Sequence, residues 1–272
     1  MAFLAGARLS PPDAQPLLGF LVAGFLLLVA GLAILTARRQ SPPLRSAHGT
    51  RRALFYALVY ALCSGCFARV VAPALLAREH SPWLLALGDV MFVTLGLFVW
   101  VMAIAEGHAW RDYGFRGGRP TRFALTLALG VGIAFFYSAR RYAEVTAGIV
   151  TVTPDSLVFA LVFAIVGSAL PEELLFRGYL QGSLDPRTNR WARVVVPALA
   201  FTAMRSLRFL PGVDVPAASW LFHVVGISLP LGLWWGLMRD LAGGSLWPGL
   251  LSHFILEFGP ALASASPTAA GP

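Results

Sequence analysis

Long stretches without a charged side chain occupy most of this 272-residue chain. Two of them, residues 14–37 and 215–238, are each 24 residues long, and five more contain 16 or 17 residues. A helix that crosses a bilayer needs about 20 mostly apolar residues. The pattern therefore predicts an all-α fold, a polytopic integral membrane bundle of about eight transmembrane helices. The predicted helices are 16–37, 53–77, 83–105, 122–139, 156–181, 192–209, 218–238 and 245–263.

Two of these helices have weaker patterns, because 122–139 is short and 192–209 contains Arg205. A bundle of seven helices is therefore an alternative. Strict alternation of apolar and polar residues is absent, so a membrane β-barrel is not indicated. Cys63 and Cys66 lie in the second predicted helix without the βαβ context of a redox motif, and we expect two buried thiols there.

The composition supports the membrane interpretation. Charged residues make up 12% of the chain, about half the share of an ordinary soluble domain. All 21 basic residues are arginine and oppose 13 acids, which leaves a net charge of +8. These values exclude a typical soluble enzyme, a disordered chain and a disulfide scaffold. Basic charge also raises the question of nucleic acid, but the apolar runs favour the lipid bilayer as the partner, and we expect no nucleic acid.

The distribution of arginine predicts the orientation of the helices. Thirteen arginines fall in the loops 38–52, 106–122 and 182–193 and at position 239, whereas five lie on the opposite side. The other three lie inside predicted helices. Short cytoplasmic loops are rich in arginine, so these loops should face the cytoplasm and both termini should face away from it. The first apolar run is too long for a cleaved signal peptide and is expected to span the membrane.

Two adjacent acids, Glu172 and Glu173, stand within an apolar helix. A charge inside a membrane costs about 2.5–3.5 kcal/mol on insertion scales, which makes it a functional-site hypothesis by default. Glu173 and Arg177 are four residues apart, in the favourable order for an ion pair. That pair would leave Glu172 on another face without a partner nearby in sequence, where a raised pKa suits a general base. An ion-paired helix end at the interface is the alternative.

Three further positions carry polar groups at membrane depth. His253 and Glu257 share a helix face and are consistent with a base and its orienting acid, two metal ligands, oxyanion donors or a polar contact between helices. Arg205 lies four residues after Phe201 in its helix. Its long side chain can reach the outer membrane interface. His223, one turn into its helix, is consistent with an interfacial histidine beside Trp220.

These motifs together resemble the CPBP family (CAAX prenyl endopeptidases and bacteriocin-processing enzymes, also called Abi), which are intramembrane proteases. The run Glu172-Glu173-Leu174-Leu175-Phe176-Arg177-Gly178 matches the first motif of the family. The run Gly243-Gly244-Ser245-Leu246-Trp247-Pro248 followed by His253 is similar to the approach to the last motif. The resemblance covers roughly residues 156–260, and the combination of motifs is more specific than either alone.

The resemblance implies a role for each matching residue. Glu172 would activate the water that attacks the scissile carbonyl, Glu173 with Arg177 would brace the site, and His253 would be an oxyanion donor. The family was long described as metalloproteases, but a glutamate mechanism without a metal is better supported. We therefore expect no cofactor, with a divalent metal as the alternative.

Two positions depart from the family pattern. Arg205 stands where a histidine is expected, and Glu257 stands where an asparagine is expected. Arginine is always charged and is therefore no base. It can pair with Glu172 and weaken it as a base, or it can stabilise an oxyanion as a fixed cation. An ionised Glu257 accepts hydrogen bonds but donates none.

Depth along the helices gives one hypothesis for a replacement. At about 1.5 Å per residue, Glu172 and His253 lie at one level, whereas Arg205 and His223 lie deeper and near each other. His223 is thus a candidate for the missing histidine. The catalytic candidates are Glu172, Glu173, Arg177, Arg205, His223, His253 and Glu257.

The sequence supports three hypotheses for function. The first is an intramembrane endopeptidase of a bacterial inner membrane that cleaves a membrane-associated peptide or an exported-protein tail in a water-filled cavity. A prenylated substrate fits less well, because the all-arginine, alanine-rich chain looks bacterial. The second is a catalytically degenerate relative that binds membrane peptides or assists assembly, and the third is an unrelated transporter. Residues 1–155 would form motif-free transmembrane helices, 156–263 the catalytic-type core and 264–272 a flexible tail.

Overall fold

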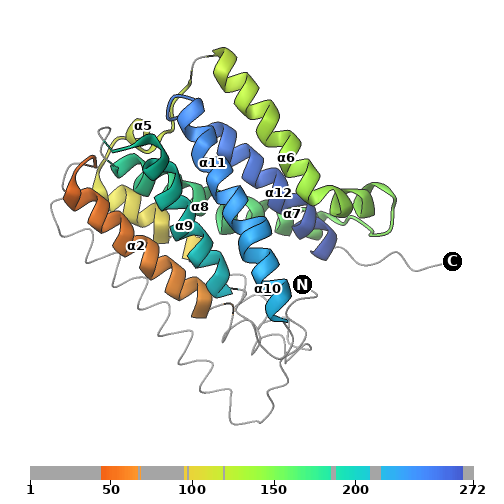
Figure 1. The fold of residues 1–272 in the computed structure, drawn as a ribbon. Coiled ribbons are helices and arrows are strands. Elements are labelled where there is room, and N and C mark those ends of the chain that lie inside the picture. The colour runs from red at the N-terminus through yellow and green to blue at the C-terminus, as the bar shows by residue number, and fades with distance from the viewer. Residues whose placement is uncertain are drawn as a thin grey trace, which may run out of the picture.

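The computed structural model describes residues 44–66, 68, 95, 96, 98–118, 120–184, 188–208 and 216–265. These residues form helices and connecting loops, without a strand in the described ranges (Figure 1). The all-α prediction is therefore confirmed for this part of the chain. The predicted helix 16–37, and parts of 53–77 and 83–105, lie outside the described residues.

The described helices follow the predicted ones closely in the second half of the chain. They are α2 (Ala47–Cys66), α5 (Trp110–Tyr113), α6 (Pro120–Thr146), α7 (Pro154–Val162), η2 (Phe163–Ala169), α8 (Leu170–Glu172), η3 (Glu173–Gln181), α9 (Arg190–Arg208), α10 (Ala217–Phe222), η4 (His223–Ser228), α11 (Leu229–Leu241) and α12 (Trp247–Ala265). Residues 98–106 are also helical. Three continuous helices, 120–146, 154–181 and 217–241, are long and apolar enough to cross a membrane. The count of eight spans stays a prediction.

Helix α6 is longer than its apolar pattern indicates. The prediction ends at residue 139, at the first charged side chain, but the helix continues to Thr146. Arg140 and Arg141 both form ion pairs with Glu144, at 3.2 and 2.8 Å. Such pairs at spacings of three and four residues stabilise a polar final turn.

The helix that contains the two adjacent acids begins at a capping box. The Thr153 side chain accepts from the Ser156 amide, while the Ser156 hydroxyl accepts from the Thr153 amide. Pro154 occupies the first turn, where no amide donor is needed. These residues define where the helix begins, close to the predicted start at residue 156.

This helix then changes to wider π-helical turns, which the sequence pattern does not predict. Segment η2 ends two residues before Pro171. In the helix 217–241, segment η4 likewise ends two residues before Pro230. Proline lacks an amide donor and its ring clashes with the carbonyl four residues earlier. A wider turn relieves that clash, and π-helical turns are frequent at functional sites.

Close packing fixes α12 against α6 and α11. A Cβ atom at Gly130 would lie 2.2 Å from Met238 Cε and 3.1 Å from Ser252 Cβ. The Ser252 hydroxyl donates to the Gly130 carbonyl at 2.8 Å. Trp235 in turn donates from its indole to the Ser252 hydroxyl at 3.1 Å. Glycine at position 130 therefore brings the three helices together and positions the residue after Ser252.

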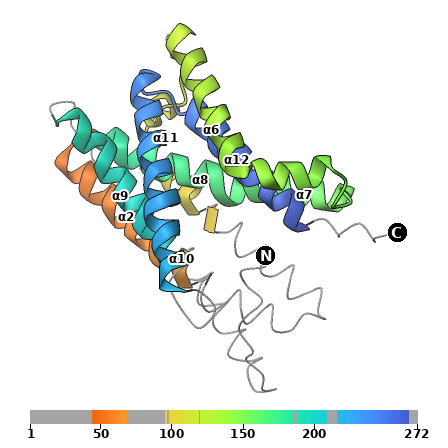
Figure 2. The same cartoon turned by 45° about the vertical axis from the view of Figure 1, so that its right-hand side comes forward.

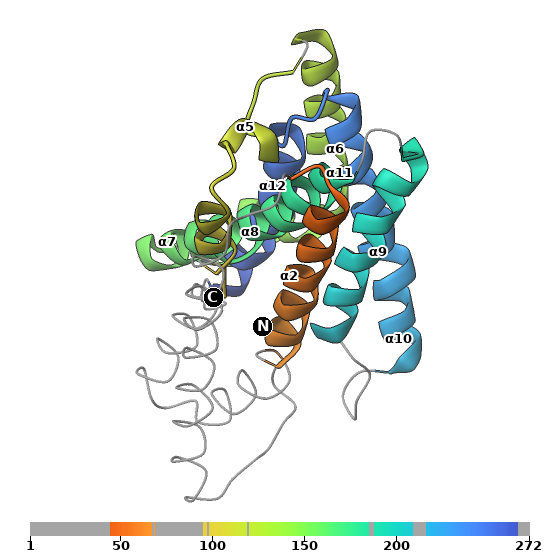
Figure 3. The same ribbon diagram turned by 90° about the vertical axis from the view of Figure 1, so that its left-hand side faces the viewer.

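The described arginine-rich loops gather at one end of the molecule. The beginnings of α2, α6 and α9 and the end of α11 lie together at the top of the views, near α5 (Figures 1–3). The end of α9 and α10 lie at the opposite end (Figures 1–3). This arrangement agrees with the sidedness predicted from the arginine counts. Cys63 is buried as a thiol, and the side chain of Cys66 lies outside the described residues, as do residues 266–272 of the predicted tail.

Candidate active site

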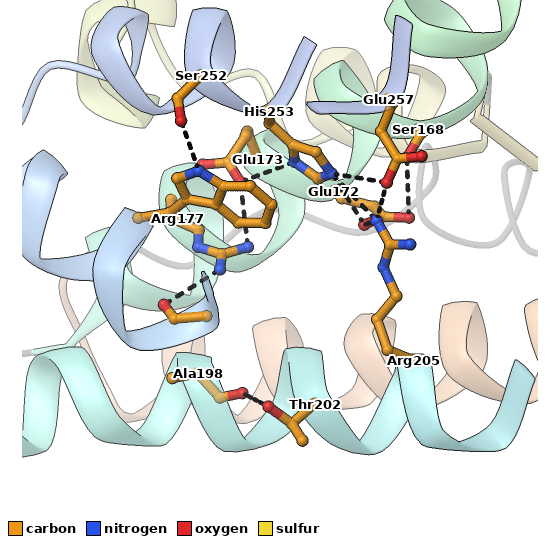
Figure 4. Close-up of polar contacts among 12 residues, drawn as sticks. Ser168, Glu172, Glu173, Arg177, Ala198, Thr202, Arg205, Ser252, His253 and Glu257 are labelled. Atoms are coloured by element: carbon orange, nitrogen blue, oxygen red, sulfur yellow. Dashed lines mark hydrogen bonds and ion pairs between the residues drawn. The ribbon is translucent and has the colours of Figure 1, made fainter. Parts of the chain in front are cut away.

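Six of the predicted site residues meet in the interior of the bundle (Figure 4). Segment α8 contributes one acid, η3 an acid and an arginine, α9 an arginine, and α12 a histidine and an acid. We call this group the Glu172 cluster. Its members are Glu172, Glu173, Arg177, Arg205, His253 and Glu257.

The inner half of the cluster is a fully buried ion pair. Arg177 Nη1 lies 3.2 Å from Glu173 Oε1, as the four-residue spacing predicts. Arg177 Nη2 also donates to the Gly232 carbonyl at 3.2 Å, and its guanidinium lies 4.4 Å above the centre of the Phe201 ring. Loss of one partner from such a pair leaves the other charge buried, so each of these two side chains depends on the other.

His253 is held in one orientation by its neighbours. Its ring stacks on Trp235 at a centroid distance of 4.0 Å, and its Nδ1 lies 3.2 Å from Glu173 Oε1. Arg205 Nη2 lies 3.1 Å from the other ring nitrogen, Nε2. Because a guanidinium only donates, we assign the tautomer with hydrogen on Nδ1, which donates to Glu173. The orienting acid of this histidine is therefore Glu173, on another helix, and not only Glu257.

Arg205 links the acids of α8 and α12. Its Nη2 lies 3.2 Å from Glu172 Oε2 and 2.5 Å from Glu257 Oε1. The depth estimate places Arg205 nearer to His223 than to Glu172, but that estimate considers backbone positions alone. The long side chain carries the guanidinium to the level of Glu172 and His253, where Glu172 Oε2 and His253 Nε2 are 3.7 Å apart.

Glu172 has a partner nearby in sequence, which corrects the expectation that it has none. The Ser168 hydroxyl, one turn earlier, donates to Glu172 Oε1 at 3.5 Å. The four-residue spacing between Ser168 and Glu172 is visible in the sequence and is the signal that would have revealed this contact. Trp235 and Ser252, which support His253, carry no such local signal because they act across helices.

Access to the cluster is one-sided. Glu172, Arg177 and His253 are completely buried, whereas the side chains of Arg205 and Glu257 are 13% and 17% exposed. Any water or substrate that reaches Glu172 from this side must pass the Arg205–Glu257 pair. His223 lies in η4, close enough to this pair for both charges to act on its ring. Its role as a replacement base stays a prediction.

A separate apolar hollow is lined in part by η2, α8 and α12. It has a volume of about 620 Å³ and is lined by Trp100, Trp110, Phe115, Ile165, Ala169, Leu170, Trp247, Leu250, Leu251 and Phe254. None of the Glu172 cluster side chains lines it. The expected water-filled cavity around the catalytic candidates therefore does not coincide with this hollow.

A metal site finds little support in the geometry of the described residues. Within those ranges, no group of three or more histidine, cysteine, aspartate or glutamate side chains is arranged to hold an ion. Arg177 and Arg205 instead provide the positive charge beside the carboxylates. The expectation that no cofactor is needed stays a prediction.

A second buried polar cluster surrounds the acid Glu106 near the arginine-rich end. We call it the Glu106 cluster. Its members are Arg52, Tyr56, Glu106, His108, Tyr113 and Tyr179. Arg52 forms an ion pair with Glu106, and the Tyr56 hydroxyl donates to Glu106 at 2.8 Å. The contacts of Glu106 with Tyr56 and of Tyr113 with Tyr179 join segments far apart in sequence. Local spacing therefore does not predict the cluster as a whole.

Comparison with known proteins gives one family. Neither the curated proteins nor the solved structures gave a match to this chain. The matched family and the three long apolar helices together indicate an integral membrane protein. Residues 154–259, which contain the whole Glu172 cluster, match the family model of the Type II CAAX prenyl endopeptidases, Rce1-like, and this match confirms the resemblance predicted from the motifs.

Proposed function

We propose that this protein is an intramembrane endopeptidase that hydrolyses a peptide bond, with Glu172 as the general base. The match to a membrane endopeptidase family supports the activity class. The observation that carries the assignment to Glu172 is the different engagement of two adjacent buried acids. Glu173 is committed to Arg177 and to His253 Nδ1. Glu172 instead faces the partly exposed side of the cluster, beside Arg205.

The proposed reaction needs one water and one proton carrier. Glu172 takes a proton from water, and the resulting hydroxide adds to the scissile carbonyl. The tetrahedral intermediate then breaks its carbon–nitrogen bond, and the protonated Glu172 returns the proton to the leaving amine. The products are a free carboxylic acid and a free amine, and Glu172 is regenerated.

The oxyanion of the intermediate needs hydrogen-bond donors. Arg205 is a permanent donor next to Glu172, and fixed donors in a buried site give large stabilisation. His253 donates at Nε2 only after it takes up a proton, because its Nδ1 hydrogen already goes to Glu173. We therefore assign the oxyanion contact first to Arg205. Glu257 balances the charge of Arg205 and holds it in place.

The substrate we propose is a membrane-associated peptide or the tail of an exported protein. Access beside Arg205 and Glu257 suits an extended chain, which must displace water and part of this ion pair to reach Glu172. The location we propose is a bacterial inner membrane, with residues 156–263 as the catalytic-type core. We propose that no metal takes part, so a chelator should leave the rate unchanged.

The test compares peptide cleavage by the wild-type protein and by Glu172→Gln in membranes, with mass spectrometry of the products. Candidate substrates are synthetic peptides with an apolar segment and exported-protein tails. We expect products from the wild type and none from Glu172→Gln. The matched control is Glu106→Gln, which removes an equally buried acid from the other cluster and should still cleave. Equal cleavage by Glu172→Gln would overturn the assignment.

A second function is favoured by one observation, the ion pair between Glu172 and Arg205. A carboxylate held by a guanidinium is a weaker base, and a degenerate family member would bind membrane peptides without cutting them. Photo-crosslinking separates the two functions. Peptides that crosslink to the wild type and remain intact would support the binding function, and cleavage lost in Glu172→Gln would support the protease.

A further inference from the structure

Arg239, in the last turn of α11, is buried without a counter-ion in the described part of the chain. Its residue is 9% exposed, and its Nε has no hydrogen-bond acceptor there. None of the ion pairs between described residues includes it, although its neighbour Asp240 pairs with Arg190 at 2.6 Å. A buried charge is costly unless it is paired. Arg177, which is completely buried, also has an Nε without an acceptor, but its guanidinium has a carboxylate, a carbonyl and an aromatic ring as partners.

The surroundings of Arg239 add positive charge. The charges of Arg116 and Arg45 oppose that of Arg239, and those of Asp240 and Glu173 attract it. Arg116 is held in place, since its Nη2 donates to the Gly243 carbonyl at 2.9 Å. Two further guanidinium groups therefore repel the charge of Arg239, and a bound anion would offset that repulsion.

The Arg239 guanidinium packs closely against Gly182. A Cβ atom at Gly182 would lie 3.1 Å from Arg239 Nη2, so a larger residue at this position would crowd the guanidinium. Arg45 and Arg116 are exposed, and they give access from outside to the buried Arg239. The site therefore has a buried cation packed beside a glycine, with two exposed arginines at its outer edge.

The position of Arg239 indicates which anion is available. The apolar helix 217–241 ends two residues after Arg239, at the end of the molecule where the described arginine-rich loops gather (Figure 1). A helix that spans a bilayer ends at the level of the headgroups, whose phosphates match the planar donor fork of arginine. Basic pockets at the cytoplasmic ends of transmembrane helices bind acidic headgroups. We infer that Arg239, with Arg45 and Arg116, binds the phosphate of an anionic membrane lipid.

The test titrates the detergent-purified full chain with dioctanoyl phosphatidylglycerol. Native mass spectrometry measures the bound lipid, and the midpoint temperature of unfolding measures stabilisation. We expect phosphatidylglycerol to bind and to raise this midpoint more than dioctanoyl phosphatidylcholine does. Losing a hydrogen bond to a charged group costs enough to weaken binding by about tenfold or more, so Arg239→Gln should show at least that loss. Arg122→Gln, an exposed arginine at the same end, is the control and should bind as the wild type does.

Two additional variants protect the test from a folding defect. Arg116→Gln changes an exposed side chain and should weaken phosphatidylglycerol binding without unfolding the protein. Arg239→Lys keeps the charge and should retain more binding than Arg239→Gln. Wild-type binding in Arg116→Gln and Arg239→Gln, or no preference for phosphatidylglycerol over phosphatidylcholine, would overturn the proposal. Stabilisation by inorganic phosphate without any effect of phosphatidylglycerol would overturn the lipid assignment. This inference is independent of the proposed peptidase activity.

Discussion

Two buried clusters in this protein contain ionisable side chains, but their charges are arranged differently. In the Glu106 cluster, one acid faces one arginine, and the Tyr56 hydroxyl donates to the same carboxylate oxygen. In the Glu172 cluster, three acids share two arginines and one histidine. The first arrangement has one arginine for one acid. In the second, Glu172 and Glu257 share a single arginine, Arg205. Burial of charge alone therefore does not distinguish a catalytic site from a structural contact.

The protonation states also differ. Burial and the nearby Glu106 carboxylate raise the pKa of the Tyr113 phenol well above its ordinary value, so this phenol stays neutral at physiological pH. Its hydroxyl donates to the Ala103 carbonyl at 3.2 Å and is thus a fixed structural donor. The Glu172 cluster instead places His253 between Glu173 and Glu257, acids on two helices. A proton can transfer between the histidine and either acid. The comparison predicts that the first cluster affects stability and the second affects the reaction.

The largest expected effect is on stability, from Arg177→Met. Removing one partner of a buried pair costs about 3–5 kcal/mol because the other charge remains buried. The corresponding change in the other cluster, Arg52→Met, should cost less, roughly 1–3 kcal/mol. Arg52 is 20% exposed, and Glu106 keeps its bond from Tyr56. Denaturant titrations of the purified protein measure both free energies of unfolding. An equal cost for the two variants would remove the distinction between the clusters.

The next effect is on the reaction rate. If Arg205 stabilises the oxyanion, Arg205→Met should lower kcat by about 10²–10³-fold, the usual effect of losing one such donor. Arg52→Met, which removes an arginine from the Glu106 cluster, should leave kcat unchanged. Steady-state cleavage kinetics of both variants in the same membranes test this difference. A faster Arg205→Met enzyme would show that Arg205 restrains Glu172 instead.

A double-mutant cycle sharpens the role of the Arg205–Glu257 pair. Arg205→His alone leaves Glu257 beside Glu172 without its cation, so we expect little activity. Adding Glu257→Asn removes that negative charge and supplies an amide donor, and should recover part of the rate. Residues in one ion-pair network usually couple by about 0.5–3 kcal/mol. Additive effects on kcat in the four proteins of the cycle would contradict a shared function.

The smallest effect is expected at the surface. Arg190 pairs with Asp240 at 2.6 Å, but its side chain is 47% exposed. Exposed pairs contribute about 0–1 kcal/mol, so Arg190→Gln should lower the free energy of unfolding by no more than that. Cleavage should proceed at the wild-type rate. A loss as large as that of Arg177→Met would mean that exposure is a poor guide to the contribution of a charge here.

The sequence predicted those parts of the site that depend on local spacing. The Glu173–Arg177 pair follows from four-residue spacing, and the pairing of Arg205 with Glu172 follows from the departure at one motif position. The contact between Glu173 and His253 joins two helices 80 residues apart, so no local pattern contains it. The reach of Arg205 was underestimated because depth along a helix ignores side-chain length.

The limits of the fold prediction have similar causes. Apolar runs locate the helices 154–181 and 217–241 within a few residues, because burial in lipid requires them. The wide turns before Pro171 and Pro230 depend on how a ring fits against the preceding carbonyl, which hydropathy does not describe. The Glu106 cluster depends on contacts between α2, residues 98–106 and η3, and these contacts exist only after the helices pack.

The role of Glu172 is tested by the cleavage rates of Glu172→Gln and Glu106→Gln, reconstituted side by side in liposomes with one peptide substrate. Loss of a general base lowers the rate by about 10²–10⁴-fold. We expect this loss of cleavage rate for Glu172→Gln, and the wild-type rate for correctly folded Glu106→Gln. Cleavage by Glu172→Gln at the rate of Glu106→Gln would contradict the claim that Glu172 activates the attacking water.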